Sequence, residues 1–188
     1  MYDVNVKGAV VLDIGAYIGD SPIYWVHKGA SKVIAVEPVQ QHYRQLVENC
    51  KDLPVIPILG SVGTQVPELP ASMIRNPRHG VWTAKGSEKY LDISLLNFTQ
   101  LVETYKPDVV KINCEGCEHF IADELFSLSK LGVRKLILQI HNIGGLKHKE
   151  LLQRLEQIFG TGRITKFKDD ETITVIWEFD NPGMTITT

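Results

Sequence analysis

The chain has 188 residues, of which 44% are apolar and 22% are charged, and its formal net charge is −2 at pH 7. These values are typical of one globular domain, so we expect a single domain over residues 1–188 and exclude collagen, coiled coils and disordered proteins. The weak negative charge disfavours nucleic acid as a partner, because proteins that bind it usually gather Lys and Arg into a basic patch.

The sequence carries no sign of membrane insertion or export. No apolar run approaches the roughly 18 residues that a membrane-spanning helix needs, and the N-terminus lacks the basic-then-apolar pattern of a signal peptide. We therefore expect a cytoplasmic protein without a membrane partner. The sequence leaves open whether it forms a homo-oligomer.

The first sixty residues alternate short apolar runs with amphipathic stretches. This pattern is typical of a parallel sheet with helices on both faces. We predict strands at residues 9–14, 33–36 and 55–59. The third strand belongs at a sheet edge, because Pro57 cannot donate a hydrogen bond to a neighbouring strand.

Two helices are predicted between these strands. The first begins at Asp20, whose side chain can cap it, and has Pro22 in its first turn. The second follows Pro38 and has one apolar stripe at helical spacing. This stripe consists of Val39, Tyr43, Leu46, Val47 and Cys50.

Residues 60–93 lose all periodicity and are rich in Gly and Pro. A long irregular segment in a compact domain is usually functional. This one also carries a group of basic side chains, Arg75, Arg78, Lys85 and Lys89. We interpret it as a lid over the substrate.

Regular structure resumes at Asn97, whose side chain can cap a helix. Further strands are predicted at residues 108–113 and 135–140, and further helices at residues 118–131 and 147–159. Apolar and polar residues alternate in residues 163–168 and 172–179, on either side of Asp169 and Asp170. This pattern predicts an antiparallel hairpin. The predicted fold is therefore a doubly wound α/β sheet.

The three cysteines give an ambiguous signal. Only Cys114 and Cys117 have the spacing of a redox or metal motif, and no second ligand pair for a structural zinc ion is found. We interpret these two as reduced, partly buried thiols and Cys50 as a packing residue on a helix. A regulated disulfide or a metal role is the alternative.

The loop Asp13–Asp20 follows the first predicted strand, where a doubly wound sheet binds its ligand. Gly15 lets the backbone approach a ligand closely, and Gly19 permits tight packing of the next helix on the sheet. Asp13 can accept hydrogen bonds from loop amides and hold the turn. Asp20 either caps the helix or faces the ligand.

Glu37 ends the second predicted strand, where a carboxylate can accept hydrogen bonds from both hydroxyls of a ribose. The ligand is therefore of the adenosine type. The loop lacks the G-x-G-x-x-G spacing that brings a pyrophosphate to a helix N-terminus, and the carboxylate of Asp20 would repel one. Carboxylates favour a sulfonium cation instead, which indicates S-adenosylmethionine as the cofactor.

Two stretches resemble known methyltransferase motifs. Residues 10–20 look like the first motif of Rossmann-type class I methyltransferases, and residues 36–38 look like the second. Residues 110–118, Val-Lys-Ile-Asn-Cys-Glu-Gly-Cys-Glu, resemble the Lys-Ile-Asp-x-Glu-Gly-x-Glu signature of the FkbM-like methyltransferases. The resemblance covers about residues 9–141 and implies a seven-stranded, mostly parallel sheet whose last strand is antiparallel, as the predicted hairpin requires.

The chain departs from the family pattern at two positions. Asn113 replaces the Asp that ends the fourth strand of the family, which puts any metal or base role there in doubt. After the third strand the chain has no acidic residue for the adenine amino group, so backbone groups or Ser61 would contact adenine. The predicted cofactor-binding residues are Asp13, Gly15, Ala16, Tyr17, Gly19, Asp20, Glu37, Pro38, Ser61 and Asn113.

His141 and Glu115 are the candidate catalytic residues. His141 ends the fifth predicted strand, and with a near-neutral pKa it could take a proton from an acceptor hydroxyl or be merely structural. Glu115 could act as a base or orient the acceptor, whereas Glu118 also fits a helix's first turn. No metal is required. The remaining helical histidines, His27, His42 and His148, are interpreted as surface residues.

The predicted reaction is methyl transfer from S-adenosylmethionine to a hydroxyl of a small molecule or sugar, with catalysis mostly from positioning. One alternative is an RNA or protein methyltransferase that uses the basic residues of the irregular segment. The other is a non-catalytic nucleotide-binding scaffold with a degenerate site, which the Asn at position 113 suggests.

Overall fold

The structure is a computed structural model, and it describes residues 2–63, 94–142, 147–166 and 172–179. The predicted lid, residues 60–93, lies almost wholly outside these ranges. Its first residues are described and contain a short strand, β4 (Ser61–Val62), that pairs in parallel with β5 (Leu95–Leu96). None of the described helices has the length and apolar composition to cross a membrane.

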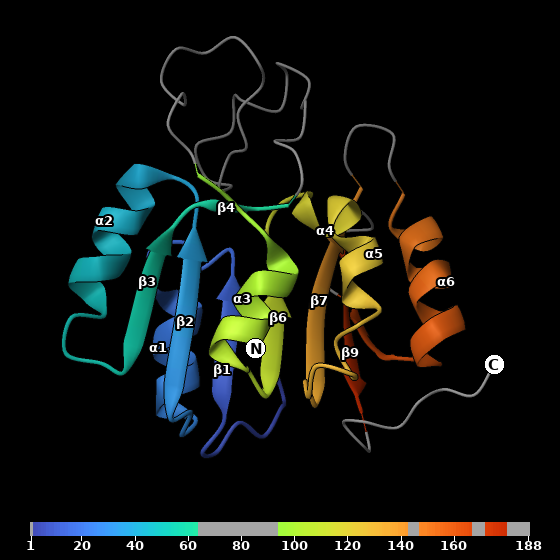
Figure 1. Cartoon of the computed structure of the whole chain (residues 1–188), viewed down its shortest axis with the longest axis horizontal. Helices are drawn as coiled ribbons and strands as arrows, with labels where there is room; N and C mark the ends of the chain where they lie inside the picture. Colours follow the sequence, from blue (N-terminus) through green and yellow to red (C-terminus); the bar gives the residue numbers. More distant parts are fainter. Residues whose placement is uncertain (1, 64–93, 143–146, 167–171, 180–188) are drawn as a thin grey trace, which may run out of the picture.

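One seven-stranded sheet has the strand order β3-β2-β1-β6-β7-β9-β8 (Figure 1). The strands, in that order, are Val55–Leu59, Lys32–Glu37, Val10–Ile14, Val109–Ile112, Lys135–His141, Thr172–Glu178 and Arg163–Lys166. The first five run parallel, and β9 is antiparallel to both of its neighbours. The predicted fold class is confirmed, including the edge position of the strand that contains Pro57 and the C-terminal hairpin.

Helices cover both faces of this sheet, with α1 behind it and α3 in front in Figure 1. The helices are α1 (Asp20–His27), α2 (Gln40–Asn49), α3 (Phe98–Tyr105), α4 (Cys117–Phe120), α5 (Ala122–Leu125) and α6 (His148–Phe159). Successive side chains of a strand point to opposite faces, so each buried strand contributes residues to the hydrophobic core on each face of the sheet. Leu12 packs in the core of α3 to α6, whereas Val11 packs with Trp25 of α1.

The buried sheet also contains an ion pair between neighbouring strands. The ammonium group of Lys111 in β6 lies 2.8 Å from Oδ1 of Asp13 in β1, and both side chains are at most 2% exposed. The indole Nε1 of Trp25 donates to Oδ2 of the same carboxylate at 2.9 Å. A charge this deep is tolerated only when it is paired and hydrogen-bonded, as here.

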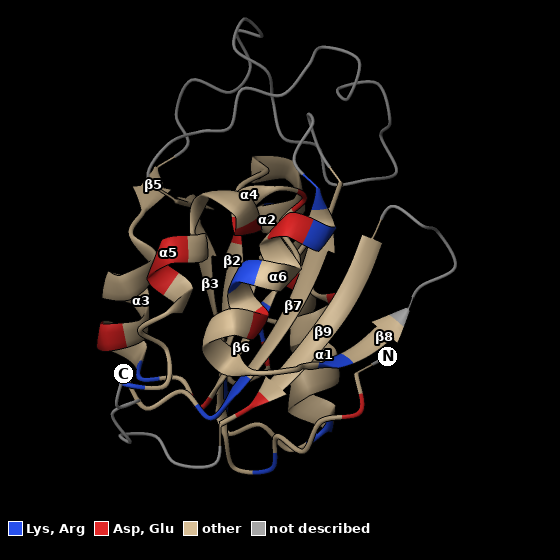
Figure 2. Ribbon diagram, turned by 90° about the vertical axis from the view of Figure 1, so that its right-hand side faces the viewer, with Lys and Arg blue, Asp and Glu red and all other residues tan. Residues whose placement is uncertain are grey.

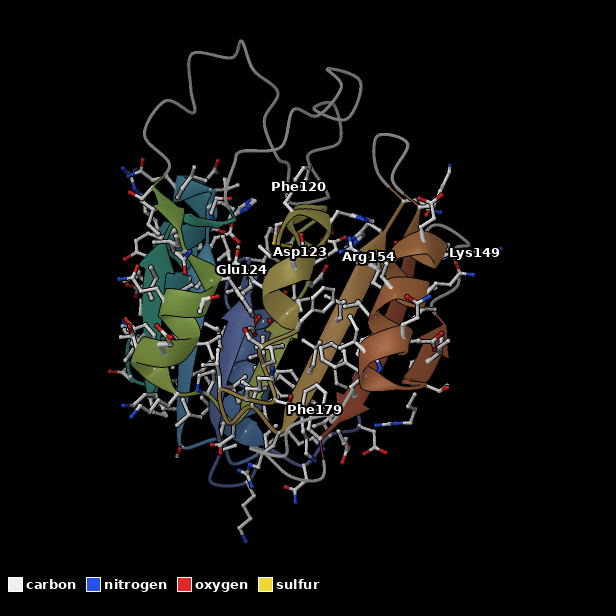
Figure 3. The ribbon with its side chains drawn as sticks, turned by 45° about the vertical axis from the view of Figure 1, so that its right-hand side comes forward. Phe120, Asp123, Glu124, Lys149, Arg154 and Phe179 are labelled. Atoms are coloured by element: carbon white, nitrogen blue, oxygen red, sulfur yellow. A yellow bond between two sulfur atoms is a disulfide. The ribbon has the colours of Figure 1, made fainter. Side chains whose placement is uncertain are left out.

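The predicted helix over residues 118–131 is wrong, because the structure has two four-residue helices followed by turns. The break lies at Ile121, whose φ of −102° and ψ of 6° are not helical. Glu118 of α4 points inward to His141, while the carboxylate of Glu124 in α5 accepts two hydrogen bonds from Thr99 of α3. Figure 3 shows Asp123 of α5 and Arg154 of α6, which form an ion pair at 2.5 Å.

Smaller predictions at helix ends had mixed outcomes. The Asn97 cap is confirmed, since its Oδ1 accepts from the amide of Gln100 at 2.7 Å. The Asp20 cap is wrong: the N-cap of α1 is Gly19, and no side chain caps this helix. Val47 is exposed rather than part of the buried stripe of α2, because the helix faces the sheet through Leu46.

Replacement of Lys111 by Met should destabilise the protein, because it leaves the carboxylate of Asp13 buried without its cation. We expect a loss of about 3–5 kcal/mol in the free energy of unfolding, measured by urea denaturation. Lys51→Met is the matched control, since Lys51 pairs with Glu48 on the surface. That change should stay within about 0.5 kcal/mol. Equal losses in the two variants would show that the buried pair has no special role.

Candidate functional site

The site lies at the carboxyl edge of the parallel strands. Strand β1 lies between β2 and β6. The chain leaves β1 toward β2 and leaves β6 toward β7, so the two connections run in opposite directions from the β1–β6 boundary. In a doubly wound sheet this topological switch point is where ligands bind. Five strand ends bring predicted site residues to this edge. They are Gly15 after β1, Glu37 at the end of β2, Ser61 after β3, Asn113 after β6 and His141 at the end of β7.

Gly15 is essential to this edge for a reason that the sequence did not reveal. Its φ is +80°, and a Cβ there would lie 1.7 Å from the backbone oxygen of Asn113. Gly15 is therefore needed where two strand ends of the protein meet, and the predicted approach of its backbone to a ligand stays a prediction. Gly19 (φ +108°) similarly makes room for Cys50, whose Sγ would lie 3.0 Å from a Cβ. Gly19 therefore packs against the end of α2, not on the sheet.

Lys111 links the ion pair to the loop. Its ammonium group donates to the carbonyl of Gly15 at 2.9 Å and lies 3.4 Å from Oγ of Ser21. Asp13 was predicted to accept from loop amides, but its carboxylate accepts from Lys111 and Trp25 instead. The turn is therefore held by the ammonium group. A single charged residue inside the apolar strand Val109–Ile112 was the signal that could have indicated this role.

Glu37 is buried and holds two segments of backbone. Its Oε2 accepts from the amide of Tyr17 at 2.9 Å, and its Oε1 accepts from the amide of Val39 at 2.9 Å. Burial raises the pKa of Glu37, while these amides and His42 lower it, and the net direction is upward. His42, predicted to be a surface residue, lies 3.3 Å from Oε1 and packs edge-on against the ring of Tyr17.

His141 is held between two carboxylates. Its Nδ1 lies 2.9 Å from Oε1 of Glu118, which also accepts from the His141 amide at 2.9 Å. Its Nε2 lies 3.4 Å from Oε1 of Glu115. Glu118 is completely buried, and its other oxygen accepts from the amide of Gly116 at 2.8 Å. The sequence suggested a favourable charge in a helix's first turn as one role of Glu118, and the structure places it in the first turn of α4 and also makes it the inner support of the His141 ring.

The two carboxylates change the charge of His141. Burial lowers the pKa of the ring, but hydrogen bonds and charges from Glu115 and Glu118 outweigh burial and raise it to about 10. His141 in turn offsets the effect of burial on Glu118, whose pKa is lowered. The imidazole is therefore protonated at neutral pH. This differs from the near-neutral pKa on which the predicted role of His141 as a base depends.

Cys114 and Cys117 form a disulfide, so the interpretation of reduced thiols is wrong. The backbone from Cys114 through Glu115 and Gly116 turns back on itself and brings the two sulfurs together. Both cysteines lie close to Glu118, as in some metal sites, but a disulfide has no thiolates to bind an ion. Cys50 is a buried free thiol at the end of α2, as predicted.

Two buried polar atoms in the site have no hydrogen-bond partner among the described residues. They are Oγ of Ser61 and Oδ1 of Asn113. Buried polar groups are nearly always paired, so unpaired atoms at a ligand-binding edge fit a bound molecule. Of the other predicted cofactor residues, Ala16 is buried and Pro38 half-buried, while Tyr17 and Asp20 are exposed.

Comparison with known proteins identifies the family. The Methyltransferase FkbM domain matches residues 13–157, which is more than half of the chain. The chain belongs to the FkbM methyltransferase family. It is therefore an enzyme that uses S-adenosylmethionine as its methyl donor. No curated protein matches the chain in a sequence search.

Solved structures share the fold of this FkbM methyltransferase at low sequence identity. A Streptococcus pneumoniae protein assigned as a tRNA (m1A22) methyltransferase, in complex with S-adenosylmethionine, is 19% identical with a TM-score of 0.57, over 98% of this chain and 71% of that one. A Methanococcus jannaschii fibrillarin, a pre-rRNA processing protein, is 17% identical with a TM-score of 0.56, over 96% and 70%. Aeropyrum pernix fibrillarin with natively bound S-adenosylmethionine is 14% identical with a TM-score of 0.55, over 94% and 70%.

The raised pKa of His141 predicts a pH-dependent stability of the FkbM methyltransferase. Because the folded pKa of about 10 exceeds the unfolded value of 6.5, the cation stabilises the fold fully below pH 6.5, and this contribution is lost as pH rises toward 10. Urea denaturation of the wild type and of His141→Gln should therefore show a stability difference that shrinks between pH 6.5 and pH 10. A difference independent of pH would contradict a buried imidazolium.

Proposed function

We propose that this methyltransferase transfers the methyl group of S-adenosylmethionine to a hydroxyl of a small molecule or sugar. When bound, the cofactor supplies a methyl group on a sulfonium, which an oxygen nucleophile can attack in line. The observation that carries the proposal is the Glu115 carboxylate, held at the ligand-binding edge by the imidazolium of His141. A hydroxyl must lose a proton during methylation, and a positioned carboxylate can accept it.

The residues at the switch point fit the adenosine part of the cofactor. Glu37 has spare acceptor capacity, since its Oε2 accepts only the Tyr17 amide among the described groups. We assign this oxygen to the ribose hydroxyls. The unpaired Oγ of Ser61 and Oδ1 of Asn113 then face the remaining polar groups of the cofactor. Gly15 shapes this site through its backbone, and Asp13 does so through its carboxylate, which holds Lys111 against the Gly15 carbonyl.

Glu115 is better placed than His141 to accept the proton. Its side chain is 32% exposed, whereas that of His141 is 8% exposed. Both nitrogens of an imidazolium carry protons, so His141 donates to the two carboxylates and has no lone pair to offer. Glu115 also has a left-handed φ of +54°, which costs energy for a residue with a side chain. Such strain is frequent at functional sites. We therefore propose that Glu115 accepts the proton and that His141 orients the Glu115 carboxylate.

RNA is the second candidate acceptor. The Streptococcus and fibrillarin structures come from proteins described by their work on tRNA and pre-rRNA, so the prediction that disfavours nucleic acid has no support from them. Against RNA stand the net charge of −2 and the carboxylates that surround the site, which would repel phosphates. Figure 2 shows only acidic charged residues on α5 and both acidic and basic residues on α6, so the ribbon shows no run of basic residues on these two helices. Small hydroxyl compounds therefore remain our first choice.

Glu37→Ala should weaken cofactor binding, because it removes both the proposed ribose acceptor and the hydrogen bonds to the amides of Tyr17 and Val39. We expect at least a tenfold higher Kd for S-adenosylmethionine by isothermal titration calorimetry, about 1.4 kcal/mol. Glu48→Ala on the exposed face of α2 is the control and should bind like the wild type. Unchanged affinity of Glu37→Ala would remove Glu37 from the cofactor site.

Transfer of tritium from labelled S-adenosylmethionine would identify the acceptor class. Hydroxylated small molecules and sugars should become labelled, whereas tRNA, rRNA fragments and protein should not. Glu115→Gln should lower kcat by roughly 10²–10⁴ and leave the Kd for the cofactor unchanged, as expected for the loss of a base. Glu103→Gln on α3 is the matched control. Labelling of RNA alone would replace the proposed acceptor.

A further inference from the structure

The Cys114–Cys117 disulfide encloses part of the candidate catalytic site. Glu115 lies between the two cysteines, and Glu118 follows the second one. Both carboxylates that contact His141 therefore belong to the loop that the disulfide closes, or stand next to it. The cysteines occupy the two variable positions of the Lys-Ile-Asp-x-Glu-Gly-x-Glu signature, so they are an addition of this chain to the shared motif.

The disulfide constrains a backbone that is otherwise unfavourable. Glu115 and Gly116 both have positive φ, +54° and +120°. A residue with a Cβ rarely stays in this region without support from its surroundings. The S–S bond joins the residue before this turn to the first residue of α4, and it thereby limits the conformations open to Glu115. Without the bond, the turn would be held only by noncovalent contacts, such as the hydrogen bond from the Gly116 amide to Glu118.

Reduction would also change the hydrogen bonding of Glu118. The Sγ of Cys114 lies 3.2 Å from Oε2 of Glu118, and within the disulfide this sulfur has no proton to donate. A reduced Cys114 is an S–H donor at that position. Because the neighbouring carboxylate and burial both disfavour a thiolate, the thiol form would persist. A new donor on Glu118 reduces the negative charge available to His141.

We propose that Cys114 and Cys117 are a redox modification site that reacts with a dithiol reductant and sets how firmly Glu115 and Glu118 hold His141. The S–S bond of the protein breaks and takes up two electrons and two protons to give two thiols, while the dithiol loses them and becomes a disulfide. The consequence for methyl transfer rests on the proposed function, in which His141 orients Glu115. The oxidised form is the one with the ordered site.

Reduction affects both Glu115 and Glu118, and both effects lower the pKa of His141. Among the described residues, the charged groups that face it are Glu115 from the loop and Glu118 from α4, while Nε2 of His119 lies 2.8 Å from the His141 carbonyl oxygen. A freer Glu115 and a more fully hydrogen-bonded Glu118 each weaken the attraction for the imidazolium. The sulfurs themselves are buried, so exchange requires local opening, and α4 has only four residues to unfold.

The test compares oxidised and dithiothreitol-reduced protein, both in EDTA. Alkylation followed by mass spectrometry should count one free thiol, Cys50, in the oxidised form and three in the reduced form. A pH titration of the His141 Cε1 proton by NMR should then show a pKa lower by roughly one unit after reduction. Neither measurement needs cofactor or acceptor, so this proposal can fail while the proposed function stands, and the reverse.

Two variants complete the test. Cys50→Ala must retain the full redox response, because it leaves the Cys114–Cys117 pair intact. The double variant Cys114→Ser, Cys117→Ser must have the lower His141 pKa with and without reductant. The wild-type comparison alone decides the outcome if a variant does not fold. Three alkylated thiols after treatment with oxidised dithiothreitol, or the same His141 pKa in both redox forms, would overturn the proposal.

Discussion

The ion pair between Lys111 and Asp13 is the interaction on which the rest of the site depends. It joins β1 to β6, the two strands whose connections diverge to create the binding edge. The same ammonium group holds the carbonyl of Gly15, so one buried cation fixes both the strands and the loop. Removing either partner would leave an uncompensated charge in the core, which is far more costly than losing a surface pair. The loop that follows β1 is therefore tied to the sheet beneath it.

Charge balance explains how the outer part of the site is organised. His141 is a cation because Glu118 and Glu115 flank it, and each of these groups would be costly to bury alone. This arrangement leaves a carboxylate, not an imidazole, to accept a proton. It also couples the site to the Cys114–Cys117 disulfide, since the loop that carries Glu115 ends in that bond. The proton acceptance and the redox reaction that we propose thus involve one short segment, Cys114 to Glu118.

Local patterns predicted the elements that local interactions stabilise. The strands around β1 and the Asn97 cap follow from apolar periodicity and from a side chain three residues before the amide that it binds. The single helix expected over residues 118–131 was wrong, because the chain breaks at Ile121 into α4 and α5, which make separate contacts with distant strands and helices. The Asp20 cap failed because the left-handed backbone of Gly19 already begins α1. Gly19 stands next to Asp20, whereas no short sequence window contains His141 or Thr99, the partners of Glu118 and Glu124.

The doubly wound sheet, the loop Asp13–Asp20 with Glu37 beyond it, and the family signature could all be predicted from the sequence, because each depends on the spacing of residues along one chain. The contacts of these residues became known from the three-dimensional fold. It showed that Gly15 must lack a Cβ because the Asn113 carbonyl lies against it, and that His141 is charged because two carboxylates surround it. Contacts and pKa values depend on groups brought together from distant strands, and spacing carries no information about them.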